Sequence, residues 1–216
     1  MFQSVRYKII VTMFAICLLP SELGAQATIE NYNSVTDSRL IDPEDHNWLS
    51  YRGTLDGWGF SKLGQINADN VSDLEPVWSF STGVLGGHES PPIVNDGVMF
   101  ITTPGNLLYA IEAATGDLLW RYQHNLPENY IAFHRTNRGV ALYGDKVYMA
   151  TLDARVVALD ASTGEKVWDT TVQDNSFGYY ITMAPLAIDG KILVGTSGGE
   201  LGIRGFVVAL DAESGN

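Results

Sequence analysis

Four short stretches of the sequence hold side chains of the kinds that bind charged ligands. They contain Glu89 ahead of a proline pair, Arg138 inside an Asn-Arg-Gly triplet, Thr182, and the run Ser197-Gly198-Gly199-Glu200. A guanidinium fork can hold carboxylates bidentately and stays charged throughout. A glutamate can contribute one oxygen to a hard cation such as Ca²⁺. The chemistry open to these residues is therefore the holding of carboxylates and of a cation.

The run Ser197-Gly198-Gly199-Glu200 is the stretch where such chemistry would centre. Its three small residues let the backbone approach a flat ring closely, and their amides can donate to it. Ca²⁺ takes six to eight oxygen ligands, so the Glu200 carboxylate cannot form a cation site alone. The alternative is an exposed glutamate in a glycine-rich turn.

The other three residues also have ordinary structural explanations. Glu89 could be a solvated turn carboxylate, since the Pro91-Pro92 pair stiffens the approach to the next strand. Arg138 could be a plain surface arginine, and Thr182 a buried strand threonine that bonds to the backbone. His134 lacks a partner His or Cys at metal-ligand spacing, so a metal role for it is disfavoured.

A repeat along the chain predicts the elements that would position these residues. Three stretches align, beginning at Ala110, Ala158 and Ala209, and the first two run through Thr-Gly to Trp120 and Trp168. The period is about 50 residues, which is typical of β-propeller blades of four strands each. The frequent glycine turns and short β-branched runs disfavour a helical repeat. Trp78 occupies the same place in a preceding unit.

The repeated tryptophans are predicted to be structural. A large ring at one point per blade packs between adjacent blades. The third copy of the repeat stops at Asn216, before its Trp. We therefore expect an N-terminal fragment of a longer protein, with about three to four blades of a propeller, because open sheet edges would be an aggregation hazard.

The first 27 residues read as a secretory signal peptide. Arg6 and Lys8 precede a short apolar run that contains Cys17, and small residues follow up to Ala27. The run is too short to span a bilayer as a helix. Cleavage would leave a mature chain without cysteine and hence without a disulfide. Residues 28–46 read as a polar lead-in and residues 47–216 as the partial propeller.

The bulk composition excludes some partners. Apolar residues make up 45% of the chain and charged residues 18%, as in ordinary globular proteins. The net charge of −12 argues against nucleic acid, whose binding needs clustered Lys and Arg. We expect no membrane span in the mature chain.

The repeat and four further stretches resemble the PQQ-dependent (pyrroloquinoline quinone) alcohol dehydrogenases, which are eight-bladed quinoproteins. The stretches are 48–54 with 60–67, 88–94, 136–141 and 195–205. The resemblance implies oxidation of an alcohol to an aldehyde or ketone in the periplasm, with PQQ and Ca²⁺ (or a lanthanide) as cofactors and a cytochrome c or another periplasmic protein as electron acceptor. A non-enzymatic exported propeller that serves as a protein-binding scaffold is the alternative.

The resemblance also implies roles for individual residues. PQQ contacts would come from Glu89, Arg138, Thr182, Ser197, Gly198 and Gly199, and Glu200 would be a calcium ligand. The catalytic base, an Asp in the family, would lie beyond residue 216, so the chain alone is expected to be inactive. The chain departs from many members at Ala132 and Phe133, where they carry two adjacent cysteines. Phe133 or His134 could cover the cofactor ring instead.

Overall fold

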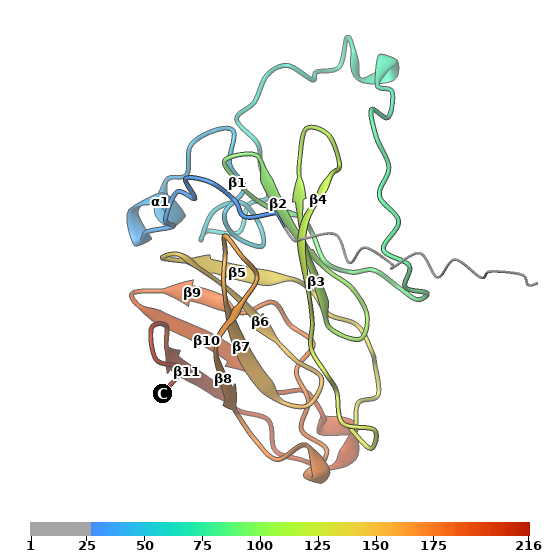
Figure 1. Cartoon of the computed structure of the whole chain (residues 1–216), viewed down its shortest axis with the longest axis vertical. Coiled ribbons are helices and arrows are strands. Elements are labelled where there is room, and N and C mark those ends of the chain that lie inside the picture. Colours follow the sequence, from blue (N-terminus) through green and yellow to red (C-terminus); the bar gives the residue numbers. More distant parts are fainter. Residues whose placement is uncertain (1–26) are drawn as a thin grey trace, which may run out of the picture.

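The computed structural model describes residues 27–216, and these residues form three antiparallel sheets that lie side by side (Figure 1). The predicted signal peptide, residues 1–27, lies outside the described residues apart from Ala27. No helix among residues 27–216 combines the length and apolar character that crossing a membrane requires.

Residues 27–216 form eleven short strands, and within each sheet the strands that follow one another in sequence pair antiparallel. The first sheet contains β1 (Ile93–Asn95), β2 (Val98–Thr102), β3 (Leu107–Glu112) and β4 (Leu118–Gln123). The second contains β5 (Val140–Tyr143), β6 (Lys146–Ala150), β7 (Arg155–Asp160) and β8 (Lys166–Thr171). The third contains β9 (Leu186–Ile188), β10 (Lys191–Gly195) and β11 (Val207–Asp211). The predicted all-β fold of propeller-type sheets is confirmed.

The helical elements are short. The α-helix α1 (Asp37–Ile41) begins after Thr36, whose hydroxyl accepts from the Arg39 amide. The 3-10 turns are Val71–Asp73, Asn175–Phe177 and Gly199–Leu201.

The repeated tryptophans join each unit to the next. The Trp120 side chain is fully buried, its indole N–H donates to the Ala161 carbonyl at 3.0 Å, and its ring covers Gly164. The same pairing recurs on either side: Trp78 with Ala113 at 3.0 Å, and Trp168 with Ala212 at 3.1 Å. Each Trp therefore docks on the glycine turn of the following unit, as the repeat predicts.

A glycine is required under each of these rings. Gly164 has φ +74°, and a Cβ at this position would lie 2.6 Å from Cε3 of Trp120. A left-handed conformation already disfavours side chains, and here the ring occupies the space as well. The Thr-Gly of the repeat thus forms the turn and also provides the surface on which the tryptophan ring packs.

The N-terminal segment laces the three sheets together. The Ala27 amide donates to Leu119 in β4, Val35 forms a bridge with Gly144, and Trp48 forms one with Val94 in β1. Val35 and Leu40 from this segment are buried in the core. Residues 28–46 also contact the first and third sheets, because Arg39 donates to Asn95 in β1 and Asp37 accepts from the Asp189 amide in the β9–β10 turn. They therefore form a strap across all three sheets.

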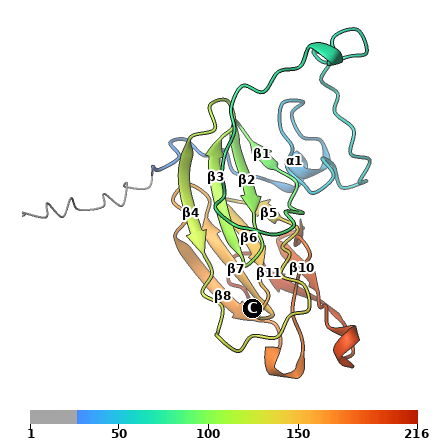
Figure 2. The same ribbon diagram turned by 90° about the vertical axis from the view of Figure 1, so that its right-hand side faces the viewer.

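Residues 55–90 take a different course from the rest of the chain. They contain no strand, and Figures 1 and 2 show them arching away from the first sheet before returning to β1. Trp78 anchors the returning part, and Tyr109 donates from its hydroxyl to the Thr82 carbonyl at 2.8 Å. This return brings Glu89 to the start of the first strand.

Candidate functional site

The predicted site residues lie at one end of the sheets. Glu89, Arg138 and Thr182 precede the first strand of each sheet, β1, β5 and β9 respectively, while residues 197–200 follow the second strand, β10. Because the first two strands of a sheet run antiparallel, the first strand starts and the second strand finishes at the same end of the sheet. Up-and-down topology therefore brings together residues that are up to about 110 positions apart. The glycine turns on which the tryptophans dock lie at the opposite end of the sheets.

Four of these side chains form a continuous row. Arg138 Nη2 lies 2.9 Å from Glu89 Oε2, and Arg138 Nη1 donates to the Thr182 hydroxyl at 2.7 Å. The Thr182 hydroxyl lies 3.4 Å from the Ser197 hydroxyl. The Arg138 side chain thus connects Glu89, which precedes the first sheet, with the Thr182 hydroxyl, which precedes the third sheet. The row is accessible, because the Arg138 and Glu89 side chains are 39% and 47% exposed.

Buried neighbours hold Arg138 in place. The Arg138 amide donates to the Thr182 carbonyl at 3.0 Å. Asn137 is buried, accepts from the Thr102 hydroxyl at 2.7 Å and donates to the Ala150 carbonyl at 2.9 Å. Asn137 therefore fixes the loop to both the first and the second sheet, and its rigid placement directs Arg138 toward the row.

Gly139 allows the Glu89 loop to approach. Its φ is +115°, and a Cβ there would lie 3.4 Å from the Ser90 hydroxyl and 3.7 Å from Pro91 Cδ. The Ser90 hydroxyl also accepts from the Thr102 amide at 3.1 Å. The Asn-Arg-Gly triplet and the Glu-Ser-Pro stretch thus pack directly against each other.

The two glycines at 198 and 199 differ in their surroundings. Gly198 has φ +117°, and a Cβ there would collide with the Gly178 carbonyl oxygen, so packing within the chain explains this glycine. A Cβ on Gly199 would meet nothing within 4 Å. Open space at Gly199 suits the close approach of a ligand, and a ligand contact at Gly198 stays a prediction.

Glu200 is exposed, and among the described residues its side chain accepts a hydrogen bond from Tyr180. The buried Tyr180 hydroxyl donates to Glu200 Oε1, and this hydrogen bond lowers the pKa of Glu200 below its ordinary value. Burial first, and then the Glu200 carboxylate, raise the pKa of Tyr180 to about 12. Tyr180 therefore stays a neutral donor that keeps Glu200 ionised and oriented.

Glu200 does not belong to a preformed metal cluster. Within residues 27–216, no three His, Cys, Asp or Glu side chains converge as metal ligands. Any cation at Glu200 would need oxygens from a bound ligand or from other chain segments. Its role as a calcium ligand stays a prediction.

Phe133 and His134 stand beside the row. The Phe133 side chain is 64% exposed, and its ring centroid lies 6.3 Å from that of His134. Both residues lie on the connection that leads to Arg138. Either ring is free to stack on a ligand, so both candidates for covering the cofactor remain.

The residues that support the row, Tyr180 and Asn137, were not predicted from the sequence. Tyr180 lies two positions before Thr182, and its backbone exchanges hydrogen bonds with Ser197 at 2.7 and 3.3 Å. Nothing in the sequence marks it, because its partner Glu200 is 20 positions away. Asn137 could have been found, since it precedes Arg138 in the triplet and a buried amide with several partners is a common loop anchor.

Comparison with known proteins identifies the chain by sequence. Residues 48–216 match the PQQ family described as glucose/ethanol/alcohol dehydrogenase, beta-propeller domain. The quinoprotein alcohol dehydrogenase PedH of Pseudomonas putida is 37% identical over 211 residues, which is 94% of this chain and 35% of that protein. The quinoprotein ethanol dehydrogenase of Pseudomonas aeruginosa is 44% identical over 165 residues, 72% of this chain and 26% of that protein.

Solved structures agree with the sequence comparison. The quinohemoprotein alcohol dehydrogenase ADHIIG from Pseudomonas putida superposes with a TM-score of 0.80 at 38% identity, over 87% of this chain and 28% of that one. A europium-containing methanol dehydrogenase gives 0.78 at 38% identity, over 83% of this chain and 32% of that one. The chain spans about a third of the length of these relatives. With residues 48–216 matched, the chain belongs to the PQQ family of alcohol dehydrogenase β-propellers.

Proposed function

We propose that this chain supplies part of the cofactor site of a periplasmic, PQQ-dependent alcohol dehydrogenase, which oxidises an alcohol to an aldehyde or ketone. The observation that carries the proposal is the row Glu89–Arg138–Thr182–Ser197. These residues come from four separate segments, the approach to β1 and the connections β4–β5, β8–β9 and β10–β11, and a scaffold propeller has no need to align them. Family membership gives the row its chemical interpretation.

The residues of the row fit PQQ, which bears three carboxylates and two adjacent carbonyl oxygens. Arg138 offers a planar, permanently charged donor, and Thr182 and Ser197 offer hydroxyls beside it. Glu89 faces the same guanidinium, and its carboxylate can accept a hydrogen bond from a donor on the polar edge of PQQ. The open space at Gly199 leaves room for the flat ring.

When bound, PQQ would supply the hydride acceptor for the alcohol, and a cation would supply polarisation of the quinone carbonyl. For this chemistry the chain's own residues bind and orient. Arg138 and the two hydroxyls would hold carboxylate and carbonyl oxygens, and Glu200, fixed by Tyr180, would offer a carboxylate oxygen to the cation. Ca²⁺ is the expected cation. A lanthanide stays an alternative, because one structural neighbour contains europium.

The proposal extends to the partners of the whole protein. A cytochrome c or another periplasmic electron acceptor would take the electrons, and several relatives are quinohemoproteins. We expect the catalytic base outside this chain, so the chain alone should bind PQQ without oxidising alcohol.

Titration with PQQ tests the proposal. The chain is titrated with PQQ in 1 mM Ca²⁺, and binding is followed by quenching of tryptophan fluorescence. Saturable binding that Arg138→Gln weakens at least tenfold supports the site. Absence of PQQ binding by the folded wild type would leave the scaffold alternative standing. Dye-linked alcohol oxidation by the chain with PQQ and Ca²⁺ would refute the expectation of inactivity.

A further inference from the structure

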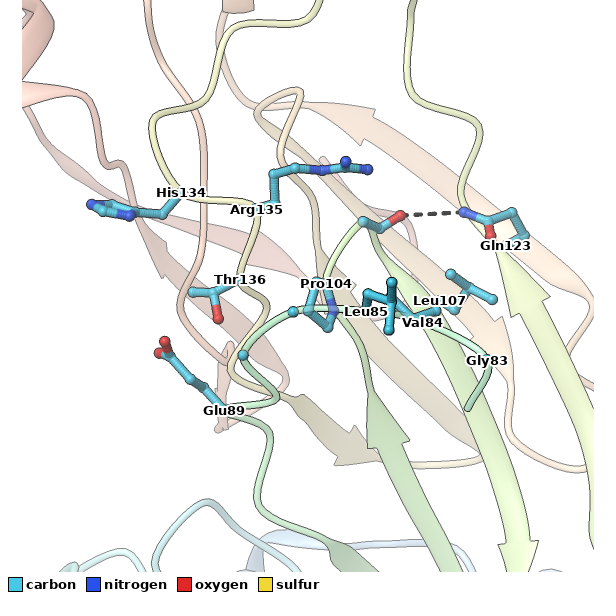
Figure 3. A pocket seen from close by; sticks show the side chains of 13 residues that line it. Gly83, Val84, Leu85, Glu89, Pro104, Leu107, Gln123, His134, Arg135 and Thr136 are labelled. Carbon is cyan, nitrogen blue, oxygen red and sulfur yellow. Dashed lines mark hydrogen bonds between the residues drawn. The ribbon is translucent and has the colours of Figure 1, made fainter. Parts of the chain in front are cut away.

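A cavity of about 690 Å³ adjoins the row at Glu89. Its apolar wall comes from Val84, Leu85, Pro104 and Leu107, and its polar side from the connection that leads to Arg138 (Figure 3). Its size and mixed lining suit a small organic molecule. The row accounts for Glu89 and leaves the other polar lining groups unexplained.

Arg135 is the first of these groups. Its backbone is fixed, since the Gly105 amide donates to its carbonyl at 3.0 Å. Among residues 27–216, no carboxylate lies within ion-pair distance of its guanidinium, and that guanidinium makes no hydrogen bond. The whole chain has 25 acidic against 13 basic residues, so acids to pair with it are plentiful. An arginine left unpaired at a cavity wall in such a chain is available to an anionic ligand.

Thr136 is the second group. The residue is only 7% exposed, and its hydroxyl is buried without a hydrogen-bond partner. An unsatisfied buried hydroxyl is destabilising, because its lost hydration is not replaced by a hydrogen bond within the protein. Thr136 lines the cavity, and Figure 3 shows its hydroxyl on the side of Glu89. A buried hydroxyl without a partner beside a cavity is a group that a polar ligand atom could satisfy.

The remaining polar neighbours do not compete for the same role. Figure 3 shows His134 pointing away from Arg135, and Gln123 already donates to the carbonyls of Gly105 and His124. Among the described residues that line it, the cavity therefore offers an unpaired guanidinium, an unpartnered hydroxyl and an apolar wall.

We propose that this cavity binds a small carboxylate-bearing organic ligand, with Arg135 as the counter-charge and Thr136 as the hydrogen-bonding group near Glu89. The carboxylate has two chemical sources, an edge of the cofactor or the far end of a hydroxy-acid substrate. The substrate case rests on the proposed function and would define its substrate class as alcohols that carry a carboxylate.

Two binding measurements on the purified protein test the proposal. The probes are 4-hydroxybutyrate, followed by calorimetry against uncharged 1,4-butanediol, and PQQ, followed by fluorescence. The variants are Arg135→Gln and Thr136→Val, with Arg121→Gln on β4 as the charge-matched control. Removing a hydrogen bond to a charged group is expected to weaken binding about tenfold or more.

The results separate the two sources. A loss of at least tenfold in 4-hydroxybutyrate binding by Arg135→Gln, with PQQ binding unchanged, assigns the site to a substrate. A matching loss in PQQ binding assigns it to the cofactor. Changes below twofold for both probes, or equal changes in Arg121→Gln, would overturn the proposal.

Thr136→Val adds a readout that a structural role would not give. It removes an unpartnered hydroxyl, so the melting temperature should stay level or rise while ligand binding weakens about threefold or more. Weaker folding with unchanged binding would count against the site. Neither probe requires turnover, so the two proposals can fail separately. If wild type binds 4-hydroxybutyrate through Arg135 but does not bind PQQ, the proposed function is refuted and this site is not.

Discussion

Arg138 and Glu89 form an ion pair of 2.9 Å across two different sheets. Both side chains are partly exposed, and such pairs contribute roughly 0–1 kcal/mol to stability. Their placement therefore matters little for folding. The pair matters for ligand binding, because the Arg138 guanidinium also donates to the Thr182 hydroxyl, just before the third sheet. The guanidinium is therefore held in one orientation from both sides. The ion pair orients the Arg138 guanidinium at the accessible end of the sheets, where a ligand can reach it.

Arg138→Lys is expected to weaken PQQ binding nearly as much as Arg138→Gln. Lysine keeps the charge but has no planar fork, so it cannot meet Glu89, Thr182 and a ligand carboxylate together. We expect a loss of about tenfold or more, measured by fluorescence titration. Both variants should unfold within about 0.5–1 kcal/mol of wild type. Wild-type affinity in Arg138→Lys would show that charge alone matters there.

The tryptophan repeat made the blade contacts predictable from the sequence. Trp120 and Gly164 belong to successive copies of one motif, so their contact follows once the repeat is taken as a propeller. The row was predictable only as a set of residues, because the distances between them depend on how four connecting segments pack. Tyr180 and Thr136 escaped prediction altogether. A donor to Glu200 and an orphan hydroxyl are defined by neighbours in space, which no spacing along the chain reveals.

Gly164→Ala is expected to destabilise the protein more than Gly190→Ala. Both glycines have positive φ, +74° and +68°, and an alanine there costs about 1–2 kcal/mol in backbone strain. A methyl group on Gly164 would also press on the buried Trp120 ring, whereas position 190 has open space. Overpacking adds a further ~1–3 kcal/mol. Urea unfolding of the two variants measures the difference, and equal losses would contradict the docking role of Trp120.

The buried pair His124–Asp153 predicts a loss of stability in acid. Both Asp153 oxygens lie 3.0 Å from His124 Nε2, and the Thr151 hydroxyl donates to Asp153 at 2.6 Å. Burial alone would raise the pKa of Asp153, but these hydrogen bonds outweigh it and lower that pKa. A depressed folded pKa stabilises the protein above the unfolded pKa of about 3.9. That stability is lost as the pH falls through the lower folded value.

Asp153→Asn tests this dependence. At pH 6 the variant should be less stable than wild type, and this difference in stability should shrink as the pH falls below about 4. The exposed Asp69→Asn makes the same change of charge and should stay within about 0.5 kcal/mol of wild type. Thermal unfolding across the pH series gives the comparison. A gap that is independent of pH would mean that Asp153 acts through packing and not through its charge.

Tyr180→Phe is expected to raise the calcium concentration that PQQ binding requires. Loss of the hydroxyl leaves Glu200 without its donor, and second-shell partners of metal ligands are typically worth about 10–100-fold in metal affinity. The calcium concentration that half-restores PQQ binding after chelation should therefore rise about tenfold, and Glu200→Gln should raise it further. Tyr179→Phe is the matched control, because its hydroxyl faces only the Arg204 carbonyl, at 3.4 Å. If Glu200→Gln leaves the calcium dependence unchanged, Glu200 is not a metal ligand, and its bond to Tyr180 then serves the loop alone.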